Sequence, residues 1–450
     1  MNTTVRYLAV LALSVASATA CAEYDGYRDW RLVQEFVACT NADEAVRPHW
    51  DFTNPMHGPW LTNPSSGSMT VTYISRTSCA AGIEYRAHGE EAWTRRWNTL
   101  YGLLNYSSDI HVFHLAGLRP GTDYECRFVT ACSQYNTAYV GTCVGRETYT
   151  FRTLDPAKKS YKVFVTTDVH GSLRLTADAM YGRSDAAEAD FYLFLGDNVN
   201  DNMNEPRFYI TNGFIDDVTR LWGTAKPTVF VRGNHDCWGR HAADGWRDYY
   251  GRPDGKGYFM VAQGPALFIV LDCAEEYFKK QAVAAQEVAA QYRAEQLVWL
   301  EDLKRTETWR KATFRIVLSH YGTRIGGERD KSFTGFATAF RSSLDEADPA
   351  RRIHLLLCGH EHFYARCLPR TKGFYHNPRN DRPNVRPRQF PRTEDETFNF
   401  TEICGNMNES MTVEVSLEKL VVRSHDVTRK GAPDLDVVEI RPDGTACAQE

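Results

Sequence analysis

Short apolar runs separated by turn residues make up most of the chain between residues 46 and 155. The runs have the length of β-strands, and no segment with helical periodicity interrupts them. They cover Ser68–Ser75, Ala81–Ala87, Asp109–Leu115, Asp123–Ala131 and Glu147–Thr153. This pattern predicts a small β-sandwich over 46–155, followed by a polar linker after Asp155-Pro156.

From Tyr161 onward, strand-length apolar runs are separated by helical or irregular stretches. Such an order predicts a sheet with helices on its faces. The clearest helix is predicted over 275–305, where Leu297, Leu300 and Leu303 lie on one side. A Pro- and Arg-rich stretch over 365–400 predicts a long surface loop.

The first twenty residues have the pattern of a secretory signal peptide. Arg6 precedes the apolar run Tyr7–Val15, and small residues lead to Ala20. We therefore expect residues 1–20 to be removed on export and 21–45 to form a leader segment. Cys21 directly after the cleavage point allows a lipid anchor, although Ala18 stands where bacterial lipoprotein signals favour Leu. No later segment reaches the 18 apolar residues expected of a transmembrane helix.

The number of cysteines and the net charge indicate the redox compartment and the kinds of partner. Twelve cysteines suit an oxidising compartment. Cys79, Cys126, Cys132 and Cys143 are close enough along the chain to form two disulfides, whose connectivity stays open. Cys358 lies in an apolar run and is expected to be a buried free thiol. A net charge of only −5 gives no electrostatic signature of nucleic-acid binding or of an anionic membrane as the main partner.

Five apolar runs end in residues that bind metals. Their ends carry Asp168 and His170, then Asp197, then Asn234, His235 and Asp236, then His320, then His360 and His362. Strands of an open sheet deliver their carboxyl ends to one edge, so these side chains are expected to converge. Asp, His and Asn supply the oxygen and nitrogen donors that suit Mn, Fe or Zn. Each motif alone is an ordinary turn; together the five predict a metal site.

This set of motifs resembles the calcineurin-like metallophosphoesterase superfamily over roughly 160–425. The resemblance implies an αββα sandwich as the catalytic domain, over 156–430, and leaves 431–450 as a C-terminal tail. In front of it, Leu118–Tyr124 resembles the turn-and-tyrosine feature of fibronectin type III domains. An N-terminal fibronectin type III-like β-sandwich followed by this domain makes the chain similar to purple acid phosphatases.

Two positions depart from the purple acid phosphatase pattern. Those enzymes carry a metal-bound tyrosine three residues after the equivalent of Asp197, where this chain has Asn200. They also have glycine where this chain has His170. An imidazole at 170 can take the coordination position of the phenolate. We therefore expect a complete site with two divalent ions, Mn, Fe or Zn, and no purple colour.

The resemblance also implies the role of each residue. One metal ion would be bound by Asp168, His170, Asp197 and His362, and the other by Asp197, Asn234, His320 and His360. Asp197 would bridge them, and coordination lowers the pKa of bound water towards about 7, which supplies hydroxide to attack phosphorus. His235 is the predicted proton donor to the leaving alcohol, and Asp236 would orient it or simply cap a helix. Arg232, Tyr321 and Arg324 lie near these motifs in the sequence and are candidates for contact with phosphate oxygens.

The predicted activity is hydrolysis of small phosphomonoesters by an exported enzyme. A phosphodiesterase acting on nucleotide or lipid-head-group diesters is the alternative, because the same metal pair supports both reactions. A third hypothesis is a non-catalytic binding protein that uses the β-sandwich, which predicts loss of part of the ligand set. No position of the set is missing.

Overall fold

The computed structural model describes residues 53–76, 78–132, 141–171, 184–199, 207, 214–220, 224–273, 283–326, 331–378, 396–429 and 431–449. The predicted signal peptide, the leader with Cys21, and Asn200 lie outside these ranges. Within them, no helix is long and apolar enough to cross a membrane. The chain forms two compact units.

The first unit comprises Val71–Phe113 and Asp123–Phe151 together with the segment that ends at Pro59. It is built from β-strands. They are β3 (Ala80–Ala87), β4 (Thr94–Trp97), β5 (Thr99–Leu100), β6 (Leu103–Leu104), β8 (Asp123–Cys132), β9 (Gly141–Val144) and β10 (Tyr149–Arg152), with parts of β1 (His57–Thr62), β2 (Ser68–Ile74) and β7 (Ile110–Ala116). Of these strands, β2, β3, β7, β8 and β10 lie at the predicted places and the others were not predicted. β8 pairs antiparallel with both β3 and β9. The ring of Tyr73 packs against Phe128 in the core, tilted by 39° and at 4.1 Å between ring centroids.

The four cysteines predicted to form two disulfides do not all pair, because Cys126 is a buried free thiol. Cys79 and Cys143 are also buried, and the side chain of Cys132 lies outside the described residues. Burial raises the pKa of Cys126 to about 12, so its thiol stays protonated and unreactive. Close spacing along the chain therefore did not place Cys126 in a disulfide. The prediction that Cys358 is a buried free thiol is confirmed.

The second unit contains two large sheets, of which the first carries three parallel strands at its centre. Its order is β24-β23-β22-β21-β11-β12-β13-β1-β2-β7. Besides β1, β2 and β7, the strands are β11 (Tyr161–Thr166), β12 (Phe191–Leu195), β13 (Thr228–Val231), β21 (Glu409–Val415), β22 (Leu420–Asp426), β23 (Asp436–Ile440) and β24 (Ala446–Ala448). Trp60–Thr70 and His114–Thr122 also belong to this unit, and Thr62 pairs with Thr228 of β13. The boundary predicted at residue 155 thus does not separate the compact units.

The second sheet has the order β14-β15-β16-β17-β20-β18-β19. Its strands are β14 (Phe259–Gln263), β15 (Ala266–Val270), β16 (Phe314–Leu318), β17 (Leu355–Cys358), β18 (Tyr364–Cys367), β19 (Tyr375–Asn377) and β20 (Thr401–Cys404). β15, β16, β17 and β20 run parallel. The predicted loop over 365–400 therefore contains a short antiparallel pair, β18 with β19.

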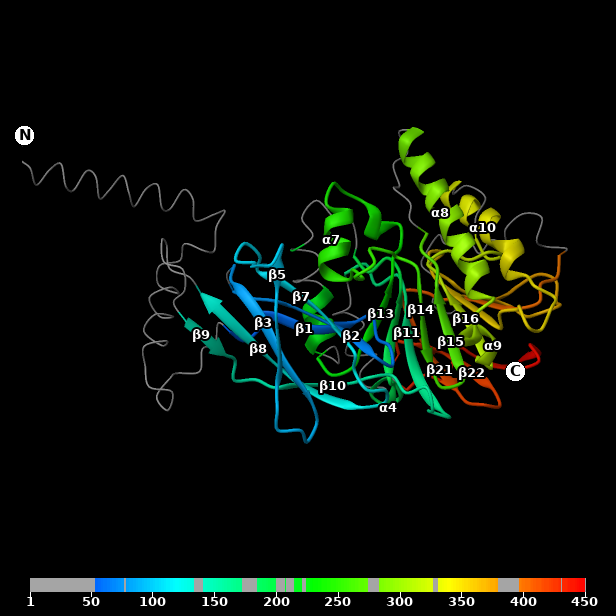
Figure 1. The fold of residues 1–450 in the computed structure, drawn as a ribbon. Coiled ribbons are helices and arrows are strands. Elements are labelled where there is room, and N and C mark those ends of the chain that lie inside the picture. Colours follow the sequence, from blue (N-terminus) through cyan, green and yellow to red (C-terminus); the bar gives the residue numbers. More distant parts are fainter. Residues whose placement is uncertain are drawn as a thin grey trace, which may run out of the picture. The chain divides into compact units, whose positions relative to one another are not determined.

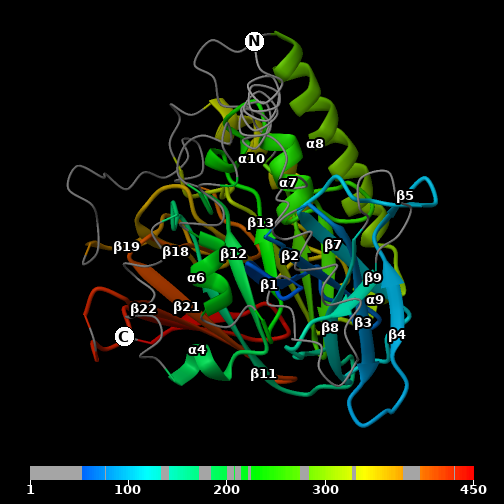
Figure 2. The same ribbon diagram turned by 90° about the vertical axis from the view of Figure 1, so that its left-hand side faces the viewer.

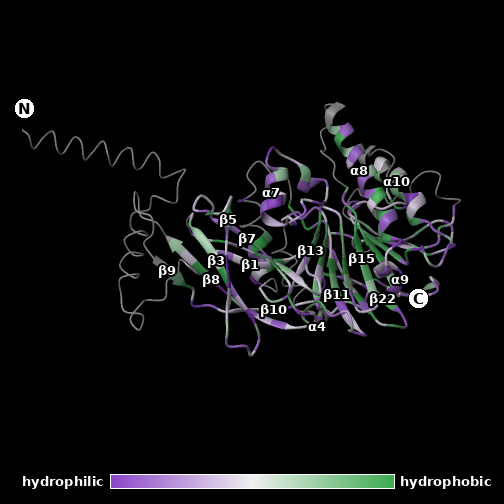
Figure 3. Cartoon of the chain, in the orientation of Figure 1, coloured by the Kyte–Doolittle hydropathy of each residue, from purple (hydrophilic) through white to green (hydrophobic). Residues whose placement is uncertain are grey.

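The two sheets pack face to face, with helices on their outer faces. Side chains such as Val231 of β13 and Val270 of β15 fill the core between them, and Figure 3 shows the hydrophobic character of both strands. On the second sheet lie α8 (Val283–Leu303), α9 (Glu307–Lys311) and α10 (Lys331–Leu344), as Figure 1 shows. The first sheet carries α4 (Ser184–Glu188), α6 (Asp216–Val218) and α7 (Ala242–Tyr249) (Figure 2). The predicted αββα sandwich is confirmed, and α8 falls within the predicted helix.

The predicted C-terminal tail over 431–450 was wrong. Val437, Val438, Glu439 and Ile440 alternate between intermediate and buried positions, as expected of a half-buried strand. They form β23, which pairs with β22 and places Val438 and Ile440 in the core between the sheets. The catalytic half therefore continues beyond residue 430.

Candidate metal centre

The site is built from strand ends whose backbone turns sharply. Among the described residues other than glycine, eight have a positive φ, and five of these are predicted ligands. They are Asp168 (53°), His170 (48°), Asp197 (51°), His360 (76°) and His362 (57°). L-residues rarely adopt this left-handed conformation, and it is tolerated where the surrounding structure enforces it. Such strain concentrates at functional sites.

Backbone hydrogen bonds and close packing hold these turns. The amide of Asp168 donates to the carbonyl of Gly196 (3.1 Å), and that of His170 donates to Asp197 (2.9 Å). Two glycines allow the closest approaches. A Cβ at Gly233 would lie 2.2 Å from Oδ1 of Asp197, and one at Gly196 would lie 2.5 Å from the His320 ring. Glycine is therefore required at both positions.

Asp168, His170, Asp197 and His362 form the first donor group. One ligand atom of each lies within 4.8 Å of the others. Nε2 of His362 lies 3.2 Å from Oδ1 of Asp168 and 3.1 Å from Nε2 of His170. Two strand ends 192 residues apart in sequence are thus brought together, as the predicted site requires.

Asp197, His320 and His360 form the second donor group, so Asp197 belongs to both. Nε2 of His320 lies 3.2 Å from Oδ1 of Asp197. Oδ1 of Asn234 lies 3.1 Å from the same nitrogen and 2.9 Å from Nδ1 of His360, which adds an amide oxygen to this group. His320 donates from Nδ1 to the carbonyl of Leu195 (2.8 Å), and this bond orients Nε2 towards the cluster.

The charges of the cluster favour a cation. Burial by itself raises the pKa of Asp168 and of Asp197, but the surrounding histidines lower both, so the two carboxylates are ionised. Burial lowers the pKa of His170 to about 4, which leaves a neutral imidazole. Burial also disfavours the charge on His320, but Asp197 and Asp168 raise its pKa to about 9; a bound cation would replace this proton. Two buried carboxylates, four histidines and an amide oxygen fit divalent Mn, Fe or Zn.

His235 lies at the rim of this cluster. Its Nε2 is 3.8 Å from Oδ2 of Asp197, and its side chain is 19% exposed. The ring stands edge-on to His170 at 4.7 Å and packs on Trp238 at 3.9 Å between centroids. It is therefore held next to the donors while one side remains accessible.

Asp236 is held by donors from the segments that carry Asp197 and Asn234. It accepts hydrogen bonds from the backbone amides of Gly233 (2.8 Å) and Asn198 (3.1 Å) and from Nδ2 of Asn198 (3.0 Å). Burial and the nearby charge of Asp197 raise its pKa to about 7. The carboxyl group joins the segments that carry Asp197 and Asn234, so it acts as a positioning residue.

Several residues that hold the site were not predicted. Glu402 is buried in β20 and accepts hydrogen bonds from the amides of Thr323 and Ile325, which fixes the segment after His320. The one sequence signal for Glu402 is a single charged residue within an apolar run. Asp272 follows the apolar strand β15 as the ligands follow theirs, and it binds Arg232 at 2.5 Å.

Neither of the two arginines suggested as phosphate contacts has a free guanidinium. Arg232 is paired with Asp272 through two nitrogens. Arg324 is fully buried, and it donates to the carbonyls of Leu368 and Thr371. Both therefore stabilise neighbouring segments.

The fold and this donor set define a metal-dependent phosphoester hydrolase. Residues 161–364 match the calcineurin-like phosphoesterase family, which the sequence motifs resemble. Two solved structures share the fold. The structure of PhoD is 13% identical, with a TM-score of 0.59 over 90% of this chain and 93% of that chain. Purple acid phosphatase PPD1 from yellow lupin (Lupinus luteus) seeds is 14% identical, with a TM-score of 0.53 over 86% and 75%. Among curated proteins, no match to the sequence was found.

Proposed function

We propose that the protein is an exported hydrolase of phosphoric monoesters that uses two divalent metal ions. The observation that carries this proposal is the pair of donor groups that share Asp197. A single carboxylate can donate one oxygen to each of two ions, and paired ions serve in-line displacement at phosphorus. Export is supported by the signal-peptide pattern from Arg6 to Ala20.

The donor groups divide the predicted ligands between two ions. Asp168, His170, Asp197 and His362 would hold one ion, and Asp197, Asn234, His320 and His360 the other. Such ions supply Lewis-acid stabilisation of phosphoryl oxygens and a nucleophile at neutral pH. We assign to Nε2 of His235 the proton transfer to the departing alcohol oxygen, and its distance of 3.8 Å from Oδ2 of Asp197 supports this role. Asp236 would hold the segment that carries Asp197 against the segment that carries Asn234.

Metal content and substrate preference test the proposal together. Elemental analysis of the purified protein is expected to give two equivalents of Mn, Fe or Zn without a purple absorption band. With Mn²⁺ or Zn²⁺, p-nitrophenyl phosphate is expected to be hydrolysed faster than bis-p-nitrophenyl phosphate. Faster turnover of the diester would replace the monoesterase by the phosphodiesterase, and absence of both metals and activity would contradict the proposal.

Two substitutions separate binding from proton transfer. Asp197→Asn is expected to lose both metals and turnover, because it removes the shared charge from both donor groups. His235→Ala is expected to retain metals and slow turnover about 10²–10⁴-fold. Asp302→Asn, at a side chain 65% exposed, is the matched control and should behave as wild type. Full activity of Asp197→Asn, or metal loss in His235→Ala, would show these roles to be wrong.

A further inference from the structure

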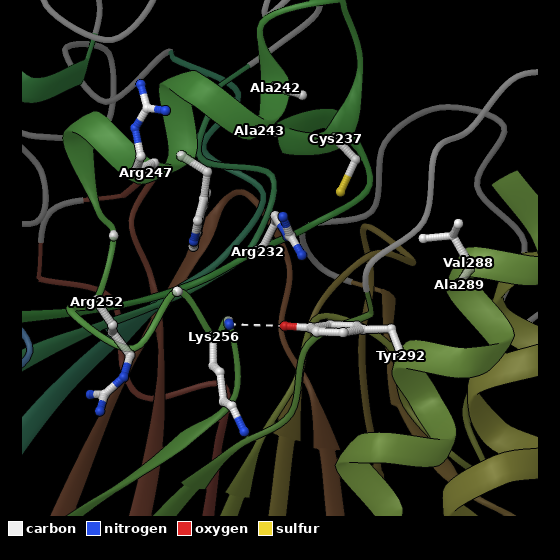
Figure 4. Close-up of a pocket in the computed structure, with 14 residues that line it drawn as sticks. Arg232, Cys237, Ala242, Ala243, Arg247, Arg252, Lys256, Val288, Ala289 and Tyr292 are labelled. Atoms are coloured by element: carbon white, nitrogen blue, oxygen red, sulfur yellow. Dashed lines mark hydrogen bonds between the residues drawn. The ribbon is translucent and has the colours of Figure 1, made fainter.

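A cavity of about 340 Å³ lies beside the segment that carries Asn234 and His235, because Arg232 and Cys237 on either side of that segment line it. It lies between α7, the turn over 251–257 and α8, and Figure 4 shows its lining. The residues that matter most are Arg232, Cys237, Trp246, Val288, Ala289 and Tyr292. The volume lies at the lower end of the roughly 300–1,000 Å³ of ligand pockets, which is room for one small organic group.

The position of the cavity connects it to the chemistry. Arg232 and Cys237 of its wall flank the segment that carries Asn234 and His235. Gly233, next to Arg232, packs its backbone against the carboxylate of Asp197. Because successive Cα atoms are about 3.8 Å apart, the wall at Arg232 lies within about 8 Å of the Asn234 backbone. A phosphate at the cluster could therefore carry its organic group into the cavity.

Charge does not decide what the cavity binds. Each of its four cations is paired with a carboxylate. The pairs are Arg232 with Asp272 (2.5 Å), Arg247 with Asp248 (2.7 Å), Arg252 with Asp254 (3.2 Å) and Lys256 with Glu295 (3.5 Å). In Figure 4 the guanidinium groups of Arg247 and Arg252 point away from the cavity. Compensated, outward-pointing charges give little attraction for a second anion.

Two aromatic side chains form rigid walls instead. The hydroxyl of Tyr292 donates to Asp272 (3.2 Å) and accepts from the amide of Gly257 (2.9 Å). Trp246 is 9% exposed, and its ring packs on Tyr250 at 4.8 Å between centroids. Side chains fixed in this way lose little entropy when a ligand binds. Two aromatic walls, with Val288 and Ala289 also in the lining, suit a flat apolar ring.

We propose that this cavity binds an aromatic group on the alcohol side of the phosphoester. The inference rests on the proposed function and narrows its substrate class. In the reaction, an oxygen from water bonds to phosphorus, the bond from phosphorus to the alcohol oxygen breaks, and His235 protonates that oxygen. The aromatic alcohol is then released from the cavity.

A filling substitution on α8 tests the assignment. The metal-loaded enzyme is assayed with benzyl phosphate and ethyl phosphate, whose leaving groups are both primary alcohols. Ala289→Phe narrows the cavity and is expected to lower the ratio of kcat/KM for benzyl over ethyl phosphate about tenfold, mainly through KM. Ala290→Phe is the matched control, since it is exposed on the same helix outside the lining, and should keep the wild-type ratio.

Two results would overturn the inference. One is an unchanged ratio in Ala289→Phe; the other is a preference of the wild type for 4-carboxybenzyl phosphate over benzyl phosphate, which would show that the cations select the ligand. Saturation-transfer NMR of benzyl alcohol gives a readout that does not need turnover. Its signal should fall in Ala289→Phe and persist in Ala290→Phe. An enzyme that binds benzyl alcohol in this way but hydrolyses no ester would contradict the proposed function alone.

Discussion

At the scale of single residues, the centre depends on backbone positions that leave no space for a side chain. Gly233 makes the closest approach to a predicted ligand, because a Cβ there would lie 2.2 Å from both the amide nitrogen and Oδ1 of Asp197. Since Asp197 is shared by both donor groups, one methyl group at this position affects both proposed ions.

Gly233→Ala is therefore expected to lower metal content and to reduce kcat/KM at least 100-fold, because a displaced ligand misaligns the reacting groups. The measurements are elemental analysis and hydrolysis of p-nitrophenyl phosphate. Gly67→Ala is the control, since its Cβ would have no neighbour closer than 3.7 Å. Wild-type metal content in Gly233→Ala would show that the backbone can shift to accommodate a Cβ without displacing Asp197.

His354 carries a pH dependence of stability that lies apart from the centre. Its Nδ1 accepts from the amide of Arg315 (3.1 Å), and its Nε2 donates to the carbonyl of Pro442 (3.0 Å). Burial lowers its pKa from 6.5 to about 4. The folded state thus keeps a neutral ring where the unfolded chain binds a proton, so stability is lost as pH falls from about 6.5 towards 4.

Between pH 7 and 5.5 this residue is expected to remove about 1 kcal/mol from the free energy of unfolding. Urea unfolding at both pH values should show this loss in the wild type and a smaller one in His354→Asn. His88→Asn, at a side chain 70% exposed, should keep the wild-type difference. Equal pH dependence in wild type and His354→Asn would refute the assignment.

At the scale of elements, the segment after β16 is fixed by a carboxylate on β20. Glu402 accepts from the amides of Thr323, Arg324 and Ile325 and from the hydroxyl of Thr323 (2.6 Å). Glu402→Gln places an amide donor against these donors. This substitution is expected to lower the free energy of unfolding by about 1–3 kcal/mol and to weaken metal binding through His320.

Denaturant unfolding and metal content measure these effects, with Glu418→Gln as the exposed control. A Glu402→Gln protein as stable as that control would show that the segment holds its conformation without the carboxylate. If Glu402→Gln loses stability but keeps its full metal content, the carboxylate contributes to folding and is not needed to position His320.

The same element shows where sequence reasoning succeeds and where it fails. Asp168, Asp197 and His320 could be predicted because each follows its own apolar run directly, so the signal is local. The contacts of Glu402 span 77–79 positions and leave no mark near either partner. Similarly, Thr62 pairs with Thr228, which no pattern before residue 155 indicates. Pairings between distant segments are fixed by packing, which a one-dimensional pattern does not contain.

At the scale of the whole molecule, the C-terminal strands belong to the sheet that supports the centre. The order β23-β22-β21-β11 connects β23 with the strand that leads to Asp168. Val438 and Ile440 are fully buried, and Asp436 accepts from the hydroxyl of Tyr364 (2.8 Å). Two buried aliphatic side chains stabilise by about 3–6 kcal/mol, which is comparable with the total stability of a typical domain.

A chain that ends at Asp434 is therefore expected to be insoluble or to have a melting temperature far below that of the wild type. A chain that ends at Ala448 keeps β24 and should have the melting temperature of the wild type. Circular dichroism on heating and metal content distinguish the two. Because β22 would become an exposed edge and Tyr364 would lose its buried partner, the damage should reach β21 and β11 and release the metals as well. Wild-type melting and full metal content in the shorter chain would mean that the centre needs only the strands before residue 430.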